Sequence, residues 1–361
     1  MKIVPLEALK PGDKLARPLF STSGQFLLHQ ETILTNQLLD RLMKYEIEHA
    51  YITKDISINL DSKTFIEKDH KNKVVQYIRE SFHTIYNHPI NGNTFIVEQA
   101  AEGLKQVVGD MNKLVKQNND IVSLLSDVFV FDDSIFTHSL NVTIYTLTIA
   151  RELPFTKQEL EELGLGALLH DIGKLKIPKE ILLKPDRLSK EEYEIVKHHT
   201  VYGYDMIKLI PNIPQSVLRC VKEHHERLNG TGYPEGLSSD KLHIFSKIIG
   251  VADTFDAMTT ERVYQDKRLP HEALEILYTG SGTLFEQKYI ELFRQNVAVY
   301  PNGMKIVLND GRKGIVIKQN NEVSDRPILT ILEEQGKAVK ETYEIDLSKH
   351  LNLVVQKIYN E

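Results

Sequence analysis

Histidine and aspartate residues recur inside apolar, helix-forming segments of this chain, and this feature constrains its fold more than any other. From about residue 132 to residue 295 the sequence reads as one helix after another. Several of these segments carry an imidazole or a carboxylate within or at the end of the apolar stripe. Burying such groups costs free energy unless each finds a partner, so the fold must supply partners for all of them.

The candidate groups occur at five places in this region. They are His138 and His199, each on the apolar stripe of a single predicted helix; the pairs His170-Asp171 and His224-His225, each at the end of a predicted helix; and Asp253, directly after the apolar run Ile248 to Ala252. Taken singly, each has a plainer explanation as a hydrogen-bonded core residue or a helix cap. If each of these explanations held separately, five independent coincidences would be needed. We therefore interpret the seven side chains as one metal centre. Imidazole and carboxylate ligands suit Fe, Mn or Zn and do not select among them.

The rest of the chain predicts three further parts. Residues 1–60 alternate short apolar pieces with turns and predict a small α+β module, and residues 61–130 predict a helical connector. Residues 297–361 predict a small β module, which leaves 131–296 as the multi-helix domain. We therefore expect a mainly α protein whose helical domain is flanked by a small N-terminal α+β module and a small C-terminal β module.

The second helix of the connector has an ambiguous apolar pattern. From Leu104 to Phe129 its apolar residues are spaced alternately four and three apart. This spacing is typical both of a helix face buried in a globular core and of a two-stranded coiled coil. The sequence thus leaves open either core packing or a homodimer formed through the connector.

Composition excludes some classes of function. The chain has 44 Lys and Arg residues against 50 Asp and Glu, so its net charge of -6 gives no general attraction to nucleic acid polymers. Its one cysteine, Cys220, rules out an intrachain disulfide and is expected to be a buried, inert thiol. No run approaches the roughly 18 apolar residues of a membrane-spanning helix. We expect a cytoplasmic protein.

The motifs of the helical region resemble those of the HD-GYP branch of the HD phosphohydrolases. They are HDIGK at 170–174, KPDRLS at 184–189, HTVYG at 199–203, HHERLNGTGYP at 224–234 and VADTFDAMT at 251–259, in the order of the family. The resemblance implies an all-helical catalytic domain with two or three metal ions, usually iron or manganese. It also implies hydrolysis of the bacterial second messenger cyclic di-GMP to pGpG by a hydroxide that bridges the metals, with GMP as a further product left open.

The resemblance also assigns roles to residues. One metal is expected to bind His138, His170, Asp171 and Asp253, and the other Asp171, His199, His224 and His225. Asp171 would then bridge two divalent ions, with Fe or Mn expected and Zn as an alternative. Asp171 and Lys174 are the expected catalytic residues, and Lys174, Arg262, Tyr233 and Gly232 the expected substrate contacts. The loop around Gly232 can also be no more than a tight turn.

Three positions depart from the family pattern. Ser134 stands where members with a third metal have Glu, which favours two metals, and Asn229 replaces an aspartate. After Arg262 the chain reads Val263-Tyr264-Gln265 instead of Pro-Tyr and a basic residue. Two alternatives therefore stay open: a phosphohydrolase for another cyclic or linear nucleotide, and a catalytically weak signalling module that binds cyclic di-GMP.

Overall fold

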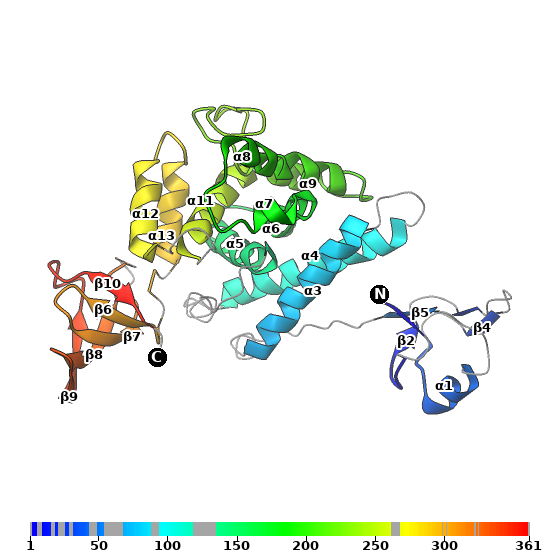
Figure 1. The fold of residues 1–361 in the computed structure, drawn as a ribbon, viewed down its shortest axis with the longest axis horizontal. Coiled ribbons are helices and arrows are strands. Elements are labelled where there is room, and N and C mark those ends of the chain that lie inside the picture. The colour runs from blue at the N-terminus through cyan, green and yellow to red at the C-terminus, as the bar shows by residue number, and fades with distance from the viewer. Residues whose placement is uncertain are drawn as a thin grey trace.

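The computed structural model describes residues 2–5, 9–15, 19–20, 26–28, 32–42, 49–53, 68–87, 94–117, 135–260, 268–297, 299–300, 302–320, 323 and 325–359. Figure 1 shows a helical body with a small α+β unit near the N-terminus and a small sheet near the C-terminus. This mainly α architecture confirms the predicted fold class. No helix among the described residues is long and apolar enough to cross a membrane.

The N-terminal unit is built from short strands and one helix. Strands β1 (Lys2–Pro5), β5 (His49–Thr53) and β2 (Lys14–Leu15) form an antiparallel sheet in the order β1-β5-β2, and β3 (Leu19–Phe20) pairs with β4 (Phe26–Leu28). Helix α1 (Asn36–Leu42) lies between β4 and β5 in sequence. A separate small core, which includes Leu15, Leu34 and Ala50, holds this unit together.

Helices α3 (Lys68–Asn87) and α4 (Thr94–Gln117) pack against the helical body as part of its core. The apolar face of α4 is buried within the chain, with Leu104 and Val108 fully covered. Gly164 of the body faces Val108 closely enough that an added Cβ would clash with its side chain. The α4 seam is therefore used for core packing over the described residues, and its predicted continuation, 118–129, lies outside them.

The body itself is a bundle of helices around α5. Its elements are α5 (Ile135–Ala150), α6 (Lys157–Leu169), the 3₁₀ turn η4 (Ile172–Lys176), α7 (Lys179–Leu182), α8 (Lys190–Lys197), α9 (His199–Ile207), α10 (Gln215–Glu223), α11 (Ile244–Thr259), α12 (Pro270–Thr279) and α13 (Gln287–Asn296). Every residue of α5 from Phe136 to Ala150 is buried, so this helix forms the centre of the core.

Local capping signals set several helix starts. Thr156 and Ser189 each form a capping box with the Glu three residues later, which satisfies backbone N–H groups at the start of α6 and α8. Pro214 is the residue just before α10. The predicted single helix through His199 is two helices, α8 and α9, that meet at His198.

The C-terminal residues form a five-stranded antiparallel sheet in the order β10-β6-β7-β8-β9. Its strands are β6 (Lys305–Leu308), β7 (Lys313–Lys318), β8 (Ile328–Glu334), β9 (Lys337–Asp346) and β10 (Val355–Ile358). The side chains on its inner face belong to the same apolar core as the helices. Arg294 of α13 also binds Asp325 at 3.1 Å, so the sheet is anchored to the helical body.

Candidate metal centre

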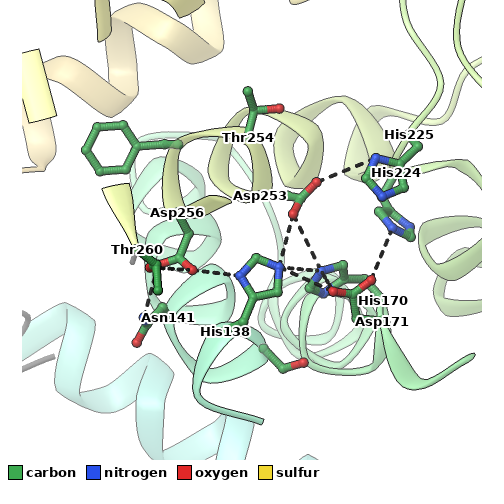
Figure 2. A network of polar contacts seen from close by, with 12 residues as sticks. His138, Asn141, His170, Asp171, His224, His225, Asp253, Thr254, Asp256 and Thr260 are labelled. Atoms are coloured by element: carbon green, nitrogen blue, oxygen red, sulfur yellow. Dashed lines mark hydrogen bonds and ion pairs between the residues drawn. The ribbon is translucent and has the colours of Figure 1, made fainter. Parts of the chain in front are cut away.

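The seven predicted ligands lie together in one cluster. Figure 2 shows six of them, His138, His170, Asp171, His224, His225 and Asp253, and the Nε2 atom of the seventh, His199, is 3.3 Å from Oδ1 of Asp171. They come from α5, the end of α6, the start of α9, the end of α10 and the middle of α11. All are buried except His225, whose side chain is 18% exposed. Five segments far apart in the sequence thus converge on one buried polar cluster.

Two groups of potential ligands share one carboxylate. Asp171, His199, His224 and His225 form one group, and His138, His170 and Asp171 form the other, with potential ligand atoms in each group within 4.8 Å of one another. Asp253 lies beside both: one oxygen is 3.1 Å from Nε2 of His138 and the other is 3.7 Å from Nδ1 of His225. Asp171 is therefore placed to contact two cations at once.

Backbone carbonyls orient three of the imidazoles. Nδ1 of His170, His199 and His224 lies 2.7, 2.7 and 3.0 Å from the carbonyl oxygen three residues earlier. Each Nδ1–H donates to that oxygen, so the unprotonated Nε2 of each ring faces the cluster. Metal-binding histidines typically have their second ring nitrogen fixed in this way.

The arrangement leaves buried acceptors without donors. Nε2 of His199 and of His224 are 3.2 Å apart, and with both Nδ1 atoms protonated neither Nε2 has a hydrogen to donate. Oδ1 of Asp171 is buried and has no hydrogen-bond partner among the residues that the structure describes. Buried acceptors facing one another are unfavourable unless a cation lies between them. The cluster therefore fits divalent metal ions, which bind neutral imidazole nitrogens and carboxylate oxygens.

Burial keeps three of these imidazoles neutral. It lowers the pKa of His199 to about 4 and, with the neighbouring imidazoles, lowers the pKa of His224 and His225 well below the ordinary value. His138 differs from these three. Burial acts to lower its pKa, but its hydrogen bonds to Asp171, Asp253 and Asp256 together have the larger effect and raise the pKa to about 10.

The two carboxylates of the cluster are ionised. Burial raises the pKa of Asp171, but the ammonium of Lys174 and the neighbouring imidazoles outweigh it and hold the pKa well below its usual range. The imidazoles of His138 and His225 have the same effect on Asp253. Lys174 lies with its Nζ 2.5 Å from Asp171, and its side chain is 14% exposed. In this structure the ammonium therefore binds the central carboxylate.

Asp256 is a site residue that the sequence reasoning missed. Its Oδ2 lies 2.6 Å from Nδ1 of His138, and its Oδ1 accepts a hydrogen bond from Asn141 at 3.0 Å. The carboxylate fixes the His138 ring so that Nε2 points at Asp171 and Asp253 (Figure 2). The available signal was its position three residues after Asp253, on the same face of the apolar helix α11.

Glu226 is a second missed residue, and it holds the loop that follows His225. Its buried carboxylate accepts hydrogen bonds from the backbone N–H groups of Glu235 at 2.7 Å, Gly236 at 3.0 Å and Leu237 at 2.9 Å. Asn229, which replaces the family aspartate, accepts from the hydroxyl of Thr231 at 2.7 Å. The loop is therefore fixed at both ends by side-chain oxygens.

The same loop brings two predicted substrate contacts beside the cluster. Tyr233 stacks on His225 with ring centroids 4.7 Å apart. Gly232 passes so close to the backbone of Glu226 and Arg227 that an added Cβ would lie 2.4 Å from the Glu226 Cα. Only glycine fits there, so the glycine is required by the close packing of the loop on the backbone that follows α10.

Of the other positions singled out in the sequence, the structure describes Cys220 but not Arg262 or its neighbours. Arg262 and Val263-Tyr264-Gln265 lie outside the described residues, as does Ser134. Cys220 is fully buried and its pKa is raised well above the ordinary value by burial, which matches the predicted inert thiol. It belongs to neither group of potential metal ligands.

Comparisons with known proteins agree with this geometry. A family described as "HD domain" matches residues 76–288, and one described as "KOW domain associated with HD domain" matches residues 305–361. The chain is 31% identical over 207 residues to the cyclic di-GMP phosphodiesterase PA4108 of Pseudomonas aeruginosa, which covers 57% of this chain and 50% of that protein. It is 35% identical over 166 residues to the 3'3'-cGAMP-specific phosphodiesterase 3 of Vibrio cholerae, covering 46% of this chain and 36% of that one.

One solved structure shares the fold. It is Bd1817 of Bdellovibrio bacteriovorus, described as an HDG"Y"P protein, with a TM-score of 0.51 and 19% identity. The match covers 81% of this chain and 97% of that one. The chain spans about half the length of the first curated relatives it matches.

Proposed function

The chain belongs to the HD domain family, in its HD-GYP branch, and we propose that it is a metal-dependent phosphodiesterase that hydrolyses cyclic di-GMP to pGpG. The observation that carries this proposal is the position of Asp171, a buried carboxylate shared by two groups of histidines. Two-metal phosphoesterases need a ligand set of this kind, because a shared ligand holds both cations against their mutual repulsion.

The proposed cofactors are two divalent metal ions, Fe or Mn, with Zn as an alternative. His138, His170, Asp171 and Asp253 would hold one, and Asp171, His199, His224 and His225 the other. When bound, such ions polarise a phosphoryl oxygen and lower the pKa of water so that it can act as a nucleophile near neutral pH. The unsatisfied Oδ1 of Asp171 and the facing Nε2 atoms support this assignment.

The chain's own residues bind and orient the substrate in this proposal. Lys174 forms an ion pair with Asp171 here, and with metal ions bound to that carboxylate its ammonium would be free to contact a phosphate oxygen. Arg262 is the second proposed phosphate contact, by its motif position. Tyr233 and Gly232 shape the wall of the site next to His225 and restrict the space open to water.

A second candidate substrate is 3'3'-cGAMP. The Vibrio cholerae relative whose name specifies this substrate is 35% identical to the chain over 166 residues, and Gln265 stands where the family pattern has a basic residue. The proposed ligands would act on the phosphate through the metal ions and would not contact the base, so they do not distinguish the two dinucleotides. The weak binding module is disfavoured, because all seven proposed ligands are present and lie close together.

The decisive experiment measures turnover and metal content together. Protein purified without oxygen and loaded with Mn or Fe is expected to hydrolyse cyclic di-GMP, with cGAMP and a linear dinucleotide as comparison substrates. Asp171→Ala should remove bound metal and activity together while helix content stays native. Asp205→Ala, an exposed position on α9, is the matched control and should keep both.

Two outcomes contradict the proposal. Hydrolysis at the wild-type rate by metal-depleted Asp171→Ala protein would show that the cluster is not the catalytic centre. Tight binding of cyclic di-GMP without turnover in either metal would favour the binding module instead.

Three expectations remain predictions. They are the domain boundaries at 60, 130 and 296, the cytoplasmic location and the homodimer. The apolar seam of α4 is buried within the chain from Leu104 to Val115, so a dimer through this part of the connector would need another of its faces.

A further inference from the structure

A lysine with two tyrosine rings around it lies beside the metal centre. Lys197 is the last residue of α8, two positions before His199. Its ammonium is 5.3 Å from the centroid of the Tyr193 ring and 5.7 Å from that of Tyr233. Tyr233 in turn stacks on His225. The cation is thus separated from a proposed metal ligand by one aromatic ring.

Neither Lys197 nor Tyr193 is explained by core packing or by the metal cluster. Helix α8 has no buried residue, and Tyr193 is 48% exposed. Among the described residues the ion-pair partner of Lys197 is Glu194, at 2.6 Å, and the Glu194 side chain is 62% exposed. The Lys197 side chain is 27% exposed, but an ion pair with so exposed a carboxylate is weak, so a phosphate group can displace Glu194 at little cost.

The position of this cation fits one feature of the substrate class. A cyclic dinucleotide carries two phosphodiester groups on opposite sides of one ring. When one phosphate is at the metal centre beside Lys174, the other must lie away from the metals yet within the span of the same small molecule. A cation one aromatic ring away from His225 is suited to that second phosphate, and the two tyrosine rings restrict where its ammonium can point.

We propose that Lys197 binds the second, uncleaved phosphodiester of the cyclic dinucleotide, and that Tyr193 and Tyr233 position its ammonium. This inference rests on the proposed function, since it assumes a substrate with two phosphates. Lys197 contacts a group that all cyclic dinucleotides share, so it raises affinity for cyclic di-GMP and cGAMP alike and does not select the base.

The test compares a substrate that has the second phosphate with one that lacks it. Wild-type protein and Lys197→Ala are assayed in Mn with cyclic di-GMP and with bis(4-nitrophenyl) phosphate, a single phosphodiester. Loss of one charge-assisted contact is expected to raise KM for cyclic di-GMP about tenfold or more, with kcat within about twofold. The kinetics of the small diester should stay unchanged.

Matched variants control for charge and for folding. Lys190→Ala removes an exposed lysine from the first position of the same helix and should leave both substrates unaffected. Tyr193→Phe keeps the ring and should behave as wild type, whereas Tyr193→Ala should raise KM for cyclic di-GMP. Unchanged thermal unfolding of each variant separates these effects from loss of structure.

The outcomes distinguish this inference from the proposed function. Normal turnover of cyclic di-GMP by both wild type and Lys197→Ala, with equal KM, overturns the role of Lys197 alone. An equal loss on both substrates also overturns it, because Lys197 would then act at the cleaved phosphate. If wild-type protein cleaves the small diester but neither binds nor cleaves a cyclic dinucleotide, the proposed function fails and this inference fails with it.

Discussion

Replacing Glu226 by glutamine should loosen the loop that carries Tyr233 without unfolding the domain. Three backbone N–H groups, from Glu235, Gly236 and Leu237, donate to its two carboxylate oxygens. Glutamine has the same shape but only one acceptor oxygen, and its amide group is a donor. At best two of the three bonds survive, and the third N–H then faces another donor.

The magnitude follows from this loss. A hydrogen bond to a charged group is worth roughly 1.5–3 kcal/mol, and a buried N–H left without a partner costs about 1–3 kcal/mol. The two free energies describe partly the same loss and do not add in full, so Glu226→Gln should destabilise the closed loop by about 2–4 kcal/mol. That is an increase of about 30-fold to nearly 1000-fold in the population of the open loop. The rest of the core should be unaffected, because this cost falls on local opening.

Amide hydrogen exchange followed by mass spectrometry measures this opening directly. Peptides that cover 229–238 should exchange faster in Glu226→Gln, whereas peptides from α5 should not change. Glu235→Gln is the matched control, because Glu235 is an exposed residue of the same loop and binds Lys222 at the surface. Equal protection of the loop in wild type and Glu226→Gln would refute the reasoning.

Two further substitutions test how the cluster is assembled. In Gly173→Ala the new Cβ would lie 1.9 Å from the His199 carbonyl oxygen, so η4 and α9 must separate. We expect thermal unfolding to show about 1–3 kcal/mol of destabilisation and elemental analysis to show loss of bound metal. Gly109→Ala on α4, where an added Cβ meets nothing within 4 Å, should be neutral or stabilising, and an equal loss in both variants would contradict the argument. Asp256→Asn removes the carboxylate that fixes His138 and should weaken metal affinity about 10- to 100-fold in a chelator competition, while unchanged affinity would show that Asp256 has no such role.

Features that depend on neighbouring residues could be predicted from the sequence. The capping boxes at Thr156 and Ser189 are complete within four residues, and both helices begin where these signals place them. The α4 pattern could not decide between a core face and a dimer seam, since both bury the same stripe. Packing against α5 and α6, which are distant in sequence, decided it over the described residues.

The convergence of the seven proposed ligands could also be predicted, whereas the contacts that support them could not. His170-Asp171 and His224-His225 each belong to a motif that is one uninterrupted stretch of sequence. Asp256 and its partner His138 are 118 positions apart, so no local pattern joins them. The break between α8 and α9 at His198 was missed for a related reason: the apolar spacing continues across it, and contact of α9 with η4 sets the new direction.

The positions of the histidines relative to helix ends explain why His138, unlike His170, His199 and His224, uses an aspartate, and not a backbone carbonyl, as the acceptor for its Nδ1–H. The last carbonyls of a helix have no N–H partner within that helix, so they can accept from a side chain. His170 and His224 follow directly on α6 and α10, and His199 follows α8 by one residue, so each Nδ1–H donates to such a carbonyl three residues earlier. His138 lies inside α5, where the carbonyl three residues back is already used by the helix. Its Nδ1 therefore needs a separate acceptor, and Asp256 on α11 provides it.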